Sequence, residues 1–253
     1  MPIAERDIMN GLAKGLAVIE TFTSERPRQS IAEAATASGL DRATARRCLL
    51  TLAHEGYADY DGKFFTLTPR VLRLGVGSLA AMPLPRIVQP LLDELSERIG
   101  ESTSVSVLDG AEIVYVARAA QRKVMSIGLM PGSRLPAYCT SMGRVMLAAL
   151  TVERAAEILG LAPLAARTSF TLTDAALILA ELDRVRAQGF ATIDQEVEVG
   201  LRSVAVPLLN MHGRVVAALN VGLPATHATM DGAVEAYLPA LRGAQSELRS
   251  MLR

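Results

Sequence analysis

Apolar residues recur at helical spacing in three short segments near the N-terminus, which predicts three helices. The first helix covers residues 10–22, and its apolar positions are Leu12, Leu16, Ile19 and Phe22. In the second segment, Ser30 stands three residues before Glu33, which is the spacing of a capping box at a helix start. Gly39 is well placed to end this second helix in the left-handed conformation. The pattern therefore predicts a tight turn between the second and the third helix.

The third predicted helix begins after Asp41, a residue type that suits the N-terminal cap of a helix. At about 100° per residue, its apolar face is formed by Ala45, Cys48, Leu49, Leu52 and Ala53. The opposite face is formed by Ala43, Thr44, Arg47 and Thr51, with Arg42 and Arg46 on one flank. This small, basic and hydroxylated surface suits a DNA major groove, where arginine can bind guanine edges or phosphate.

Short alternating segments end at Tyr57 and resume at Phe64, and Asp61-Gly62 between them predicts a hairpin. Three helices followed by a hairpin form a winged helix-turn-helix, which we predict for residues 1–68. The predicted DNA-contacting residues are Arg28, Gln29 and Ser30 beside the backbone, Arg42, Thr44, Arg46 and Arg47 on the third helix, and Lys63 at the wing tip. Two alternatives stay open: arginines that are merely solvated, and a winged helix used for protein contacts.

A further apolar helix is predicted from Pro69 to Leu79, before the proline-rich segment 82–85. We interpret residues 69–84 as a linker helix between two domains. Its apolar positions are Val71, Leu74 and Val76, and they would be exposed unless a second copy of the chain covers them. The linker therefore favours a dimer, which a DNA site with two half-sites also requires.

Residues 85–253 combine helical and alternating patterns. A hairpin is predicted over residues 103–118 with its turn at Asp109-Gly110, and a third strand over 124–129. Residues 131–140 are predicted to form a loop. The remaining predicted helices cover 85–99, 141–150, 151–159, 173–188 and 231–252, and the remaining strands cover 190–194, 203–209 and 214–222. Antiparallel hairpins interleaved with helices predict an α+β domain, with helices packed against a curved sheet.

The composition limits what the chain can bind. Half of the 253 residues are apolar, so a substantial core is available, and 26 basic residues balance 26 acidic ones. A neutral chain has no general attraction to nucleic acid or to a membrane surface, so a DNA site must be local. Residues 26–73 carry a local excess of three positive charges. Two distant cysteines, no secretory leader and no long apolar run predict a cytoplasmic protein without a membrane partner.

The loop 137–140 runs directly into a predicted helix, whose first amides suit an anion. Thr140 or Ser141 could add a hydroxyl group and Tyr138 could stack on a ring, although Thr140 and Ser141 are plain helix caps in the simpler interpretation. The acids Asp194, Glu196 and Glu198 could bind a metal or act as acid and base, but such loops are more often solvated. The three histidines have no ligand spacing, and no nucleophile stands beside one of them. We predict no catalytic residue, metal or cofactor.

Together these features resemble the IclR family of bacterial transcriptional regulators over nearly the whole chain. The resemblance rests on Gly15-Leu16 in the first helix, on the linker helix, on the segments 136–144 and 198–207, and on Ala217-Ala-Leu-Asn-Val-Gly222. The loop before Arg144 resembles the branch of the family that controls protocatechuate, 4-hydroxybenzoate and β-ketoadipate pathway genes. An enzyme or binding module that acts on an aromatic acid is the alternative from another class.

The resemblance implies a dimer, or a dimer of dimers, with a C-terminal GAF-like domain at residues 85–253 that binds a small carboxylate. It places the carboxylate on the backbone amides of Ser141 and Met142, and further pocket positions at Asp194, Leu201, Ser203, Asn220 and Gly222. The glyoxylate-sensing members carry a cysteine in place of Ser203 and serines in place of Asn220 and Gly222. Glycine at 222 leaves room for a ring. The expected partners are double-stranded promoter DNA, the effector and, for an activator, RNA polymerase.

Overall fold

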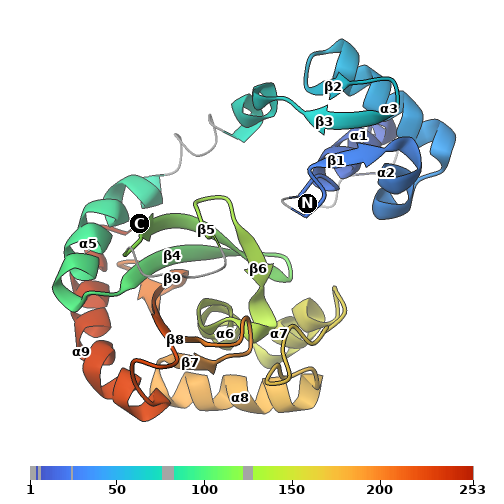
Figure 1. The fold of residues 1–253 in the computed structure, drawn as a ribbon. Helices are drawn as coiled ribbons and strands as arrows, with labels where there is room; N and C mark the ends of the chain where they lie inside the picture. The colour runs from blue at the N-terminus through green and yellow to red at the C-terminus, as the bar shows by residue number, and fades with distance from the viewer. Residues whose placement is uncertain (1–3, 5–6, 24, 76–82, 122–127, 253) are drawn as a thin grey trace. The chain divides into compact units, whose positions relative to one another are not determined.

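The computed structural model describes residues 4, 7–23, 25–75, 83–121 and 128–252 (Figure 1). The chain divides into two compact units, Met1–Ala81 and Met82–Arg253. The predicted division into 1–68, a linker at 69–84 and 85–253 stays a prediction, because much of the linker lies outside the described residues.

The N-terminal unit is a winged helix-turn-helix, as predicted. Its helices are α1 (Asn10–Glu20), α2 (Ile31–Ser38) and α3 (Arg42–His54), and its strands are β1 (Arg28–Ser30), β2 (Ala58–Tyr60) and β3 (Phe64–Leu67). The strands form an antiparallel sheet in the order β1-β3-β2. The sequence did not indicate β1, because three residues are too few for an alternating pattern.

Local side-chain chemistry sets the helix ends of this unit. Ser30 and Glu33 form the predicted capping box of α2, and Gly39 ends α2 with a φ of 67°. Asp41 caps α3 by accepting a hydrogen bond from the backbone N–H of Thr44 at 2.9 Å. All three predicted helix-end features are confirmed, and together they define the turn between α2 and α3 and so the orientation of α3.

The core of the N-terminal unit leaves part of α1 uncovered. The buried residues at its centre are Val18, Ala34, Leu49, Ala58 and Phe65. Leu12 and Leu16, two of the apolar positions of the predicted first helix, are exposed in this chain, with exposed fractions of 60% and 47%. Burial on α1 is concentrated at Val18 and Thr21, near its C-terminal end, so the apolar stripe of its first turns faces solvent.

The predicted linker helix is described in part. Pro69–Val71 form a turn of 3₁₀ helix, residues 72–75 are helical, and the rest of the prediction, Val76 included, lies outside the described residues. Leu72 and Leu74 are exposed. The next helix, α5 (Pro83–Ile99), begins two residues earlier than predicted, because a proline in the first turn of a helix removes an N–H that has no partner there.

The C-terminal unit is built on a six-stranded antiparallel sheet with the order β6-β5-β4-β9-β8-β7. The strands are β4 (Ser102–Asp109), β5 (Glu112–Ala119), β6 (Arg134–Pro136), β7 (Ala191–Asp194), β8 (Leu201–Leu209) and β9 (Val215–Pro224). Its other helices are α6 (Ser141–Ala148), α7 (Val152–Leu159), α8 (Ala175–Gln188) and α9 (Met230–Leu248). Helices α5 and α9 cover one face of the sheet and α6, α7 and α8 the other, so the α+β prediction is confirmed (Figure 1).

One edge of this sheet differs from the prediction. The hairpin of β4 and β5 is present with Gly110 in its turn. Residues 124–127 of the predicted third strand lie outside the described residues, and residues 128 and 129 are not in a strand. The edge strand is β6, within a segment predicted as a loop, and its Arg134 forms ion pairs with Glu112 and Asp109. Three residues of strand are again too short to show alternation.

Candidate nucleic-acid interface and ligand pocket

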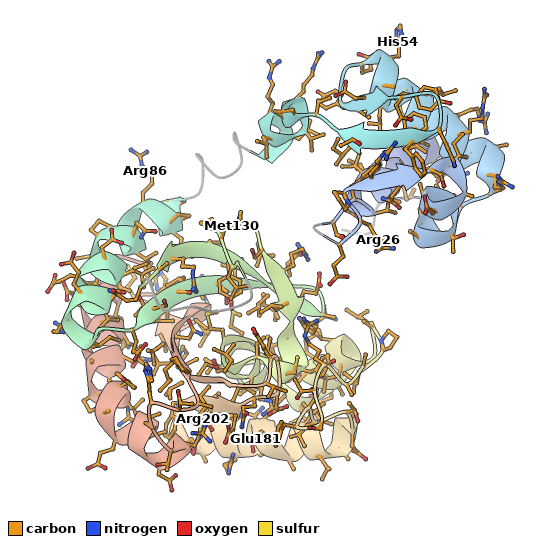
Figure 2. All side chains as sticks on the ribbon, in the orientation of Figure 1. Arg26, His54, Arg86, Met130, Glu181 and Arg202 are labelled. Carbon is orange, nitrogen blue, oxygen red and sulfur yellow. The ribbon has the colours of Figure 1, made fainter. Side chains whose placement is uncertain are left out.

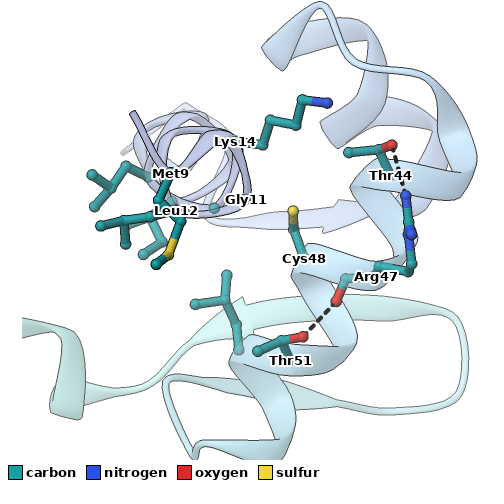
Figure 3. Close-up of a pocket in the computed structure, with 12 residues that line it drawn as sticks. Met9, Gly11, Leu12, Lys14, Thr44, Arg47, Cys48 and Thr51 are labelled. Atoms are coloured by element: carbon teal, nitrogen blue, oxygen red, sulfur yellow. Dashed lines mark hydrogen bonds between the residues drawn. The ribbon is translucent and has the colours of Figure 1, made fainter. Parts of the chain in front are cut away.

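Helix α3 presents its arginines to solvent. Arg42, Arg46 and Arg47 are exposed, as predicted. The prediction that Thr44 points outward was wrong, because only 7% of this residue is exposed. Thr44 lies on the flank of α3 that faces α1, and its hydroxyl accepts a hydrogen bond from Nη2 of Arg47 at 3.3 Å (Figure 3). Thr44 therefore orients Arg47 and is not itself placed to contact DNA.

A groove of about 570 Å³ lies between α1 and α3. Figure 3 shows Met9, Leu12 and Lys14 on the α1 side, and Arg47 and Cys48 on the α3 side. Much of the lining is apolar, and it includes the exposed stripe of α1. The groove is thus a continuation of the uncovered apolar surface.

The tip of the wing carries two cations over one aromatic ring. The guanidinium of Arg28 lies 4.2 Å from the ring centroid of Phe64, and Nζ of Lys63 lies 5.1 Å from it. Asp61 holds the turn by accepting hydrogen bonds from the backbone N–H groups of Phe64 and Lys63, and it pairs with Arg28. These contacts lower the pKa of Asp61 to about 2. Arg28 and Lys63 are therefore presented together on the wing.

The neighbouring residues of β1 are less available for DNA. The prediction for Gln29 was wrong, because only 1% of it is exposed and its Nε2 donates to Oγ1 of Thr21 at 3.0 Å. Alternation along β1 turns Gln29 toward the core, opposite Phe65. Ser30 is partly exposed, but its hydroxyl accepts from the backbone N–H of Glu33. A contact between Ser30 and DNA stays a prediction.

The C-terminal unit contains a small polar cavity between α6 and the sheet, with a volume of about 30 Å³. Its lining contains six of the eight residues predicted for the effector site, namely Ser141, Met142, Leu201, Ser203, Asn220 and Gly222. A Cβ atom added at Gly222 would meet just one atom, Cδ1 of Leu201 at 4.0 Å, so this glycine does leave room in the cavity.

The start of α6 supplies hydrogen-bond donors to this cavity. The side chain of Thr140 accepts from the N–H of Gly143, and its carbonyl accepts from the N–H of Arg144. Within the described residues no acceptor lies on the N–H groups of Ser141 and Met142, although both residues are buried. Gly143 allows this close approach of helix and loop, because a Cβ there would lie 2.2 Å from the carbonyl oxygen of Ala137.

The sheet side of the cavity is also polar. The hydroxyl of Ser203 donates to that of Ser141 at 2.9 Å, joining β8 to α6. Asn220 of β9 is 8% exposed, and its Oδ1 is buried without a hydrogen-bond partner in the described part of the chain. A buried amide oxygen that lacks a donor is costly, so a ligand that donates a hydrogen bond to it would bind favourably.

Arg118 also lines the cavity, and the sequence did not indicate it. In the β4–β5 pairing, Val105 lies opposite Ala117 but Ser106 lies opposite Tyr115, so Val116 is an extra residue in a bulge. The bulge turns Tyr115 and Arg118 to the same face, whereas strict alternation would place them on opposite faces. Burial lowers the pKa of the Arg118 guanidinium, which Tyr115 raises by less.

Two predicted effector residues lie outside the cavity. The hydroxyl of Tyr138 donates to the carbonyl of Ala165, its ring lines a separate space of about 130 Å³, and burial raises its pKa to about 12. Asp194 pairs with Arg202, its cross-strand neighbour on β8, at 2.8 Å. Leu201 and Ser203 flank Arg202 and point to the other face, so Asp194 faces away from the cavity.

Of the three acids singled out in the sequence, Asp194 and Glu196 form ion pairs, whereas Oε2 of Glu198 is buried without a hydrogen-bond partner in the described part of the chain. Glu196 pairs with Arg144 at 2.7 Å, so Asp194 and Glu196 are directed to different cations. Across the residues that the structure describes, no three His, Cys, Asp or Glu side chains converge as metal ligands. Burial raises the pKa of Cys139 to about 11, which keeps it a neutral thiol at pH 7. Among the described helices, none is long and apolar enough to cross a membrane.

Comparison with known proteins assigns both units to domains of the same protein family. A model of the IclR helix-turn-helix domain matches residues 11–62, and a model of the bacterial transcriptional regulator IclR C-terminal region matches residues 76–249. The chain belongs to the IclR family. This IclR-family protein is a ligand-responsive bacterial transcriptional regulator, so the predicted family and function are confirmed.

Several relatives of this IclR-family regulator carry names that match the predicted aromatic-pathway branch. The Pca regulon regulatory protein of Pseudomonas putida is 44% identical over 96% of this chain and 84% of its own length. The p-hydroxybenzoate hydroxylase transcriptional activator of Acinetobacter baylyi is 37% identical over 99% of this chain and 94% of its own. The inducer-binding domain of an Acinetobacter PobR double mutant, solved with 3-hydroxybenzoic acid, aligns with a TM-score of 0.63 at 34% identity, over 66% of this chain and 98% of that chain.

Proposed function

We propose that this regulator senses a small carboxylic acid of the 4-hydroxybenzoate, protocatechuate or β-ketoadipate class in the α6 cavity and binds promoter DNA as a homodimer. The observation that supports sensing is the convergence of unsatisfied polar groups: the amides of Ser141 and Met142 and the Oδ1 of Asn220. A related inducer-binding domain in complex with 3-hydroxybenzoic acid supports an acid as the ligand.

A thermal-shift screen tests the sensing step. A ligand that binds only the folded protein raises its melting temperature, by an amount that grows with ligand concentration. We expect at least one acid from a panel of hydroxybenzoates, benzoate and aliphatic carboxylates to raise the melting temperature, and the matching amides or alcohols to leave it unchanged. Turnover of the bound acid by the isolated protein would instead favour the enzyme alternative.

The exposed arginines of α3 and the two cations of the wing are proposed to bind DNA. Arg42, Arg46 and Arg47 are exposed on α3, and Arg28 of β1 and Lys63 of the wing lie over the ring of Phe64. In a winged helix-turn-helix, the third helix enters the major groove, and the wing lies near the phosphate backbone. Arg28 would exchange its pairing with Asp61 for a phosphate.

Replacing Arg47 with alanine should weaken operator binding by about 1 to 3 kcal/mol if the guanidinium contacts a base edge. A mobility-shift or anisotropy titration at several salt concentrations measures both the affinity and the number of phosphate contacts. Thr44→Val should give a smaller loss, because it removes the hydroxyl that accepts from Arg47 and leaves the guanidinium in place.

Arg86→Ala is the matched control, because it removes the same charge from an exposed position at the start of α5 (Figure 2). It should leave operator affinity unchanged. If Arg47→Ala behaved like Arg86→Ala in both affinity and salt dependence, α3 would not be the reading helix.

The uncovered stripe of α1 and the start of the linker are proposed as part of the homodimer interface. Leu12 and Leu16 are exposed on α1, as is Met9 just before it, and Leu72 and Leu74 are exposed after the wing. Contiguous exposed apolar side chains at helical spacing are typical of a protein contact surface. A second copy of the chain is the occupant that an operator with two half-sites calls for.

The double substitution Leu12→Asp, Leu16→Asp should weaken binding to a full operator by tenfold or more, on the order of 1.4 kcal/mol, and leave binding to a single half-site nearly unchanged. The reason is that charges on the stripe oppose pairing of two DNA-binding units. Because the stripe also lines the groove beside Arg47, binding to the half-site reports any direct effect on α3. Ala13→Asp, at an exposed position of the same helix, is the control. Equal losses on full and half operators would place the stripe outside the interface.

A further inference from the structure

A row of polar side chains crosses three strands at the sheet side of the α6 cavity. Arg118 of β5 lies directly opposite Ser104 of β4, and Ser104 lies directly opposite Asn220 of β9. Nη1 of Arg118 donates to Oγ of Ser104 at 2.9 Å. Arg118 and Asn220 both line the cavity. The bulge at Val116 creates this row, because it turns Arg118 to the cavity face.

The positive charge of Arg118 has no protein counter-charge in the described part of the chain. Its one side-chain hydrogen bond there is to the neutral hydroxyl of Ser104, and it belongs to none of the ion pairs. The cavity lining contains no Asp or Glu. Asp194 and Glu196 are already paired with other arginines. Residues 122–127, which follow β5 in the sequence, include no acidic residue.

The opposite side of the same cavity also suits an anion. The N–H groups of Ser141 and Met142 are the first two of α6 and have no acceptor among the described residues. Unpaired amides at a helix start attract negative charge. Oγ of Ser141 accepts a hydrogen bond from the hydroxyl of Ser203, so the hydroxyl of Ser141 can itself donate a hydrogen bond to a ligand. One cavity therefore contains two separate sites for negatively charged oxygens.

We propose that Arg118 is a specificity-determining residue that binds a second acidic group of the effector, which makes the effector a small dicarboxylate. One carboxylate lies on the α6 amides, and the other accepts from the Arg118 guanidinium. A guanidinium and a carboxylate make the strong, charge-assisted pair that Arg118 lacks within the protein. This inference rests on the proposed sensing function and narrows its ligand class.

Matched acids test the number of carboxylates directly. Adipate is compared with hexanoate, and terephthalate with benzoate, by calorimetric titration of the full-length protein. Each diacid should bind at least about tenfold more tightly than its mono-acid, because the mono-acid leaves Arg118 without a counter-charge. In Arg118→Gln the diacid should fall to the affinity of the mono-acid, and the mono-acid should be unchanged. Arg118→Lys should retain part of the affinity difference between the diacid and the mono-acid, because it keeps the positive charge.

The outcomes separate this inference from the proposed function. If the wild-type protein bound diacid and mono-acid with equal affinity, the proposal that Arg118 binds a second carboxylate would be wrong. It would also be wrong if Arg118→Gln lost affinity for both acids by the same factor. Binding of no acid at all would refute the sensing function itself. Circular dichroism and operator affinity report whether Arg118→Gln folds; if it does not, the wild-type comparison and Arg118→Lys decide.

Discussion

Replacing Arg144 with leucine should lower the free energy of unfolding of the C-terminal unit by about 3 to 5 kcal/mol. Only 2% of the Arg144 side chain and 9% of the Glu196 side chain are exposed, and Nη2 of the arginine lies 2.7 Å from Oε2 of the glutamate. Arg144 also donates from Nε to the carbonyl of Tyr138, and Glu196 accepts from the N–H of Leu172. Removing the cation leaves a buried carboxylate without its charge partner. Urea denaturation measures the loss.

Two controls isolate the cause. The double substitution Arg144→Leu, Glu196→Leu should be less destabilised than the single one, because it leaves no buried charge unpaired. Arg154→Leu breaks an exposed pair with Glu157 and should change the unfolding free energy by less than about 1 kcal/mol. If Arg144→Leu were as mild as Arg154→Leu, the buried pair would not hold α6 against the β7–β8 loop.

Replacing Ser203 with tryptophan should abolish the ligand response and leave operator binding intact. Ser203 is buried in the wall of a cavity of about 30 Å³, so an indole at this position occupies the whole site. Operator affinity is measured with and without the acid that raises the melting temperature of the wild-type protein. If this variant bound the acid with wild-type affinity, the cavity would not be the ligand site.

A milder variant guards against misfolding, since a large side chain in a packed site costs about 1 to 3 kcal/mol. Gly222→Val adds bulk at a position where a new Cβ meets a single atom at 4.0 Å, so the unliganded fold should accept it. It should still exclude the ligand. Ser203→Ala keeps the space and loses the hydrogen bond to Ser141, so it should bind the acid more weakly but retain the response.

Features set by neighbours in the sequence could be predicted from it. The capping box of Ser30 and Glu33, the left-handed turn at Gly39 and the Asp61 turn of the wing each depend on residues a few positions apart. Burial of Gln29 and Thr44 could not be predicted in this way. Gln29 is covered because β1 pairs with β3, and Thr44 because α1 packs beside α3, and both contacts join segments distant in the sequence.

In the ligand cavity, too, local features could be predicted from the sequence and features that depend on strand pairing could not. The helix start was predicted as an anion site because a loop that enters a helix is visible in the sequence. The assignment of the carboxylate to the amides of Ser141 and Met142, and four further positions, came from the family resemblance. Arg118 was missed because one extra residue in β5 reverses the alternation that a sequence pattern assumes. Asp194 was misplaced because its cross-strand partner, Arg202, turns it to the opposite face of the sheet from Ser203.

The size of the α6 cavity has a consequence for kinetics. About 30 Å³ holds roughly two water molecules, at about 10 to 15 Å³ for each, and no carboxylic acid of the proposed class. The closed form must therefore widen before a ligand can enter, and the measured dissociation constant is the intrinsic one divided by the fraction of molecules that are open. In stopped-flow experiments the observed binding rate at saturating ligand should become independent of ligand concentration and equal the rate of opening. A substitution that favours the open form would make the regulator sensitive to lower effector concentrations without changing any contact to the effector.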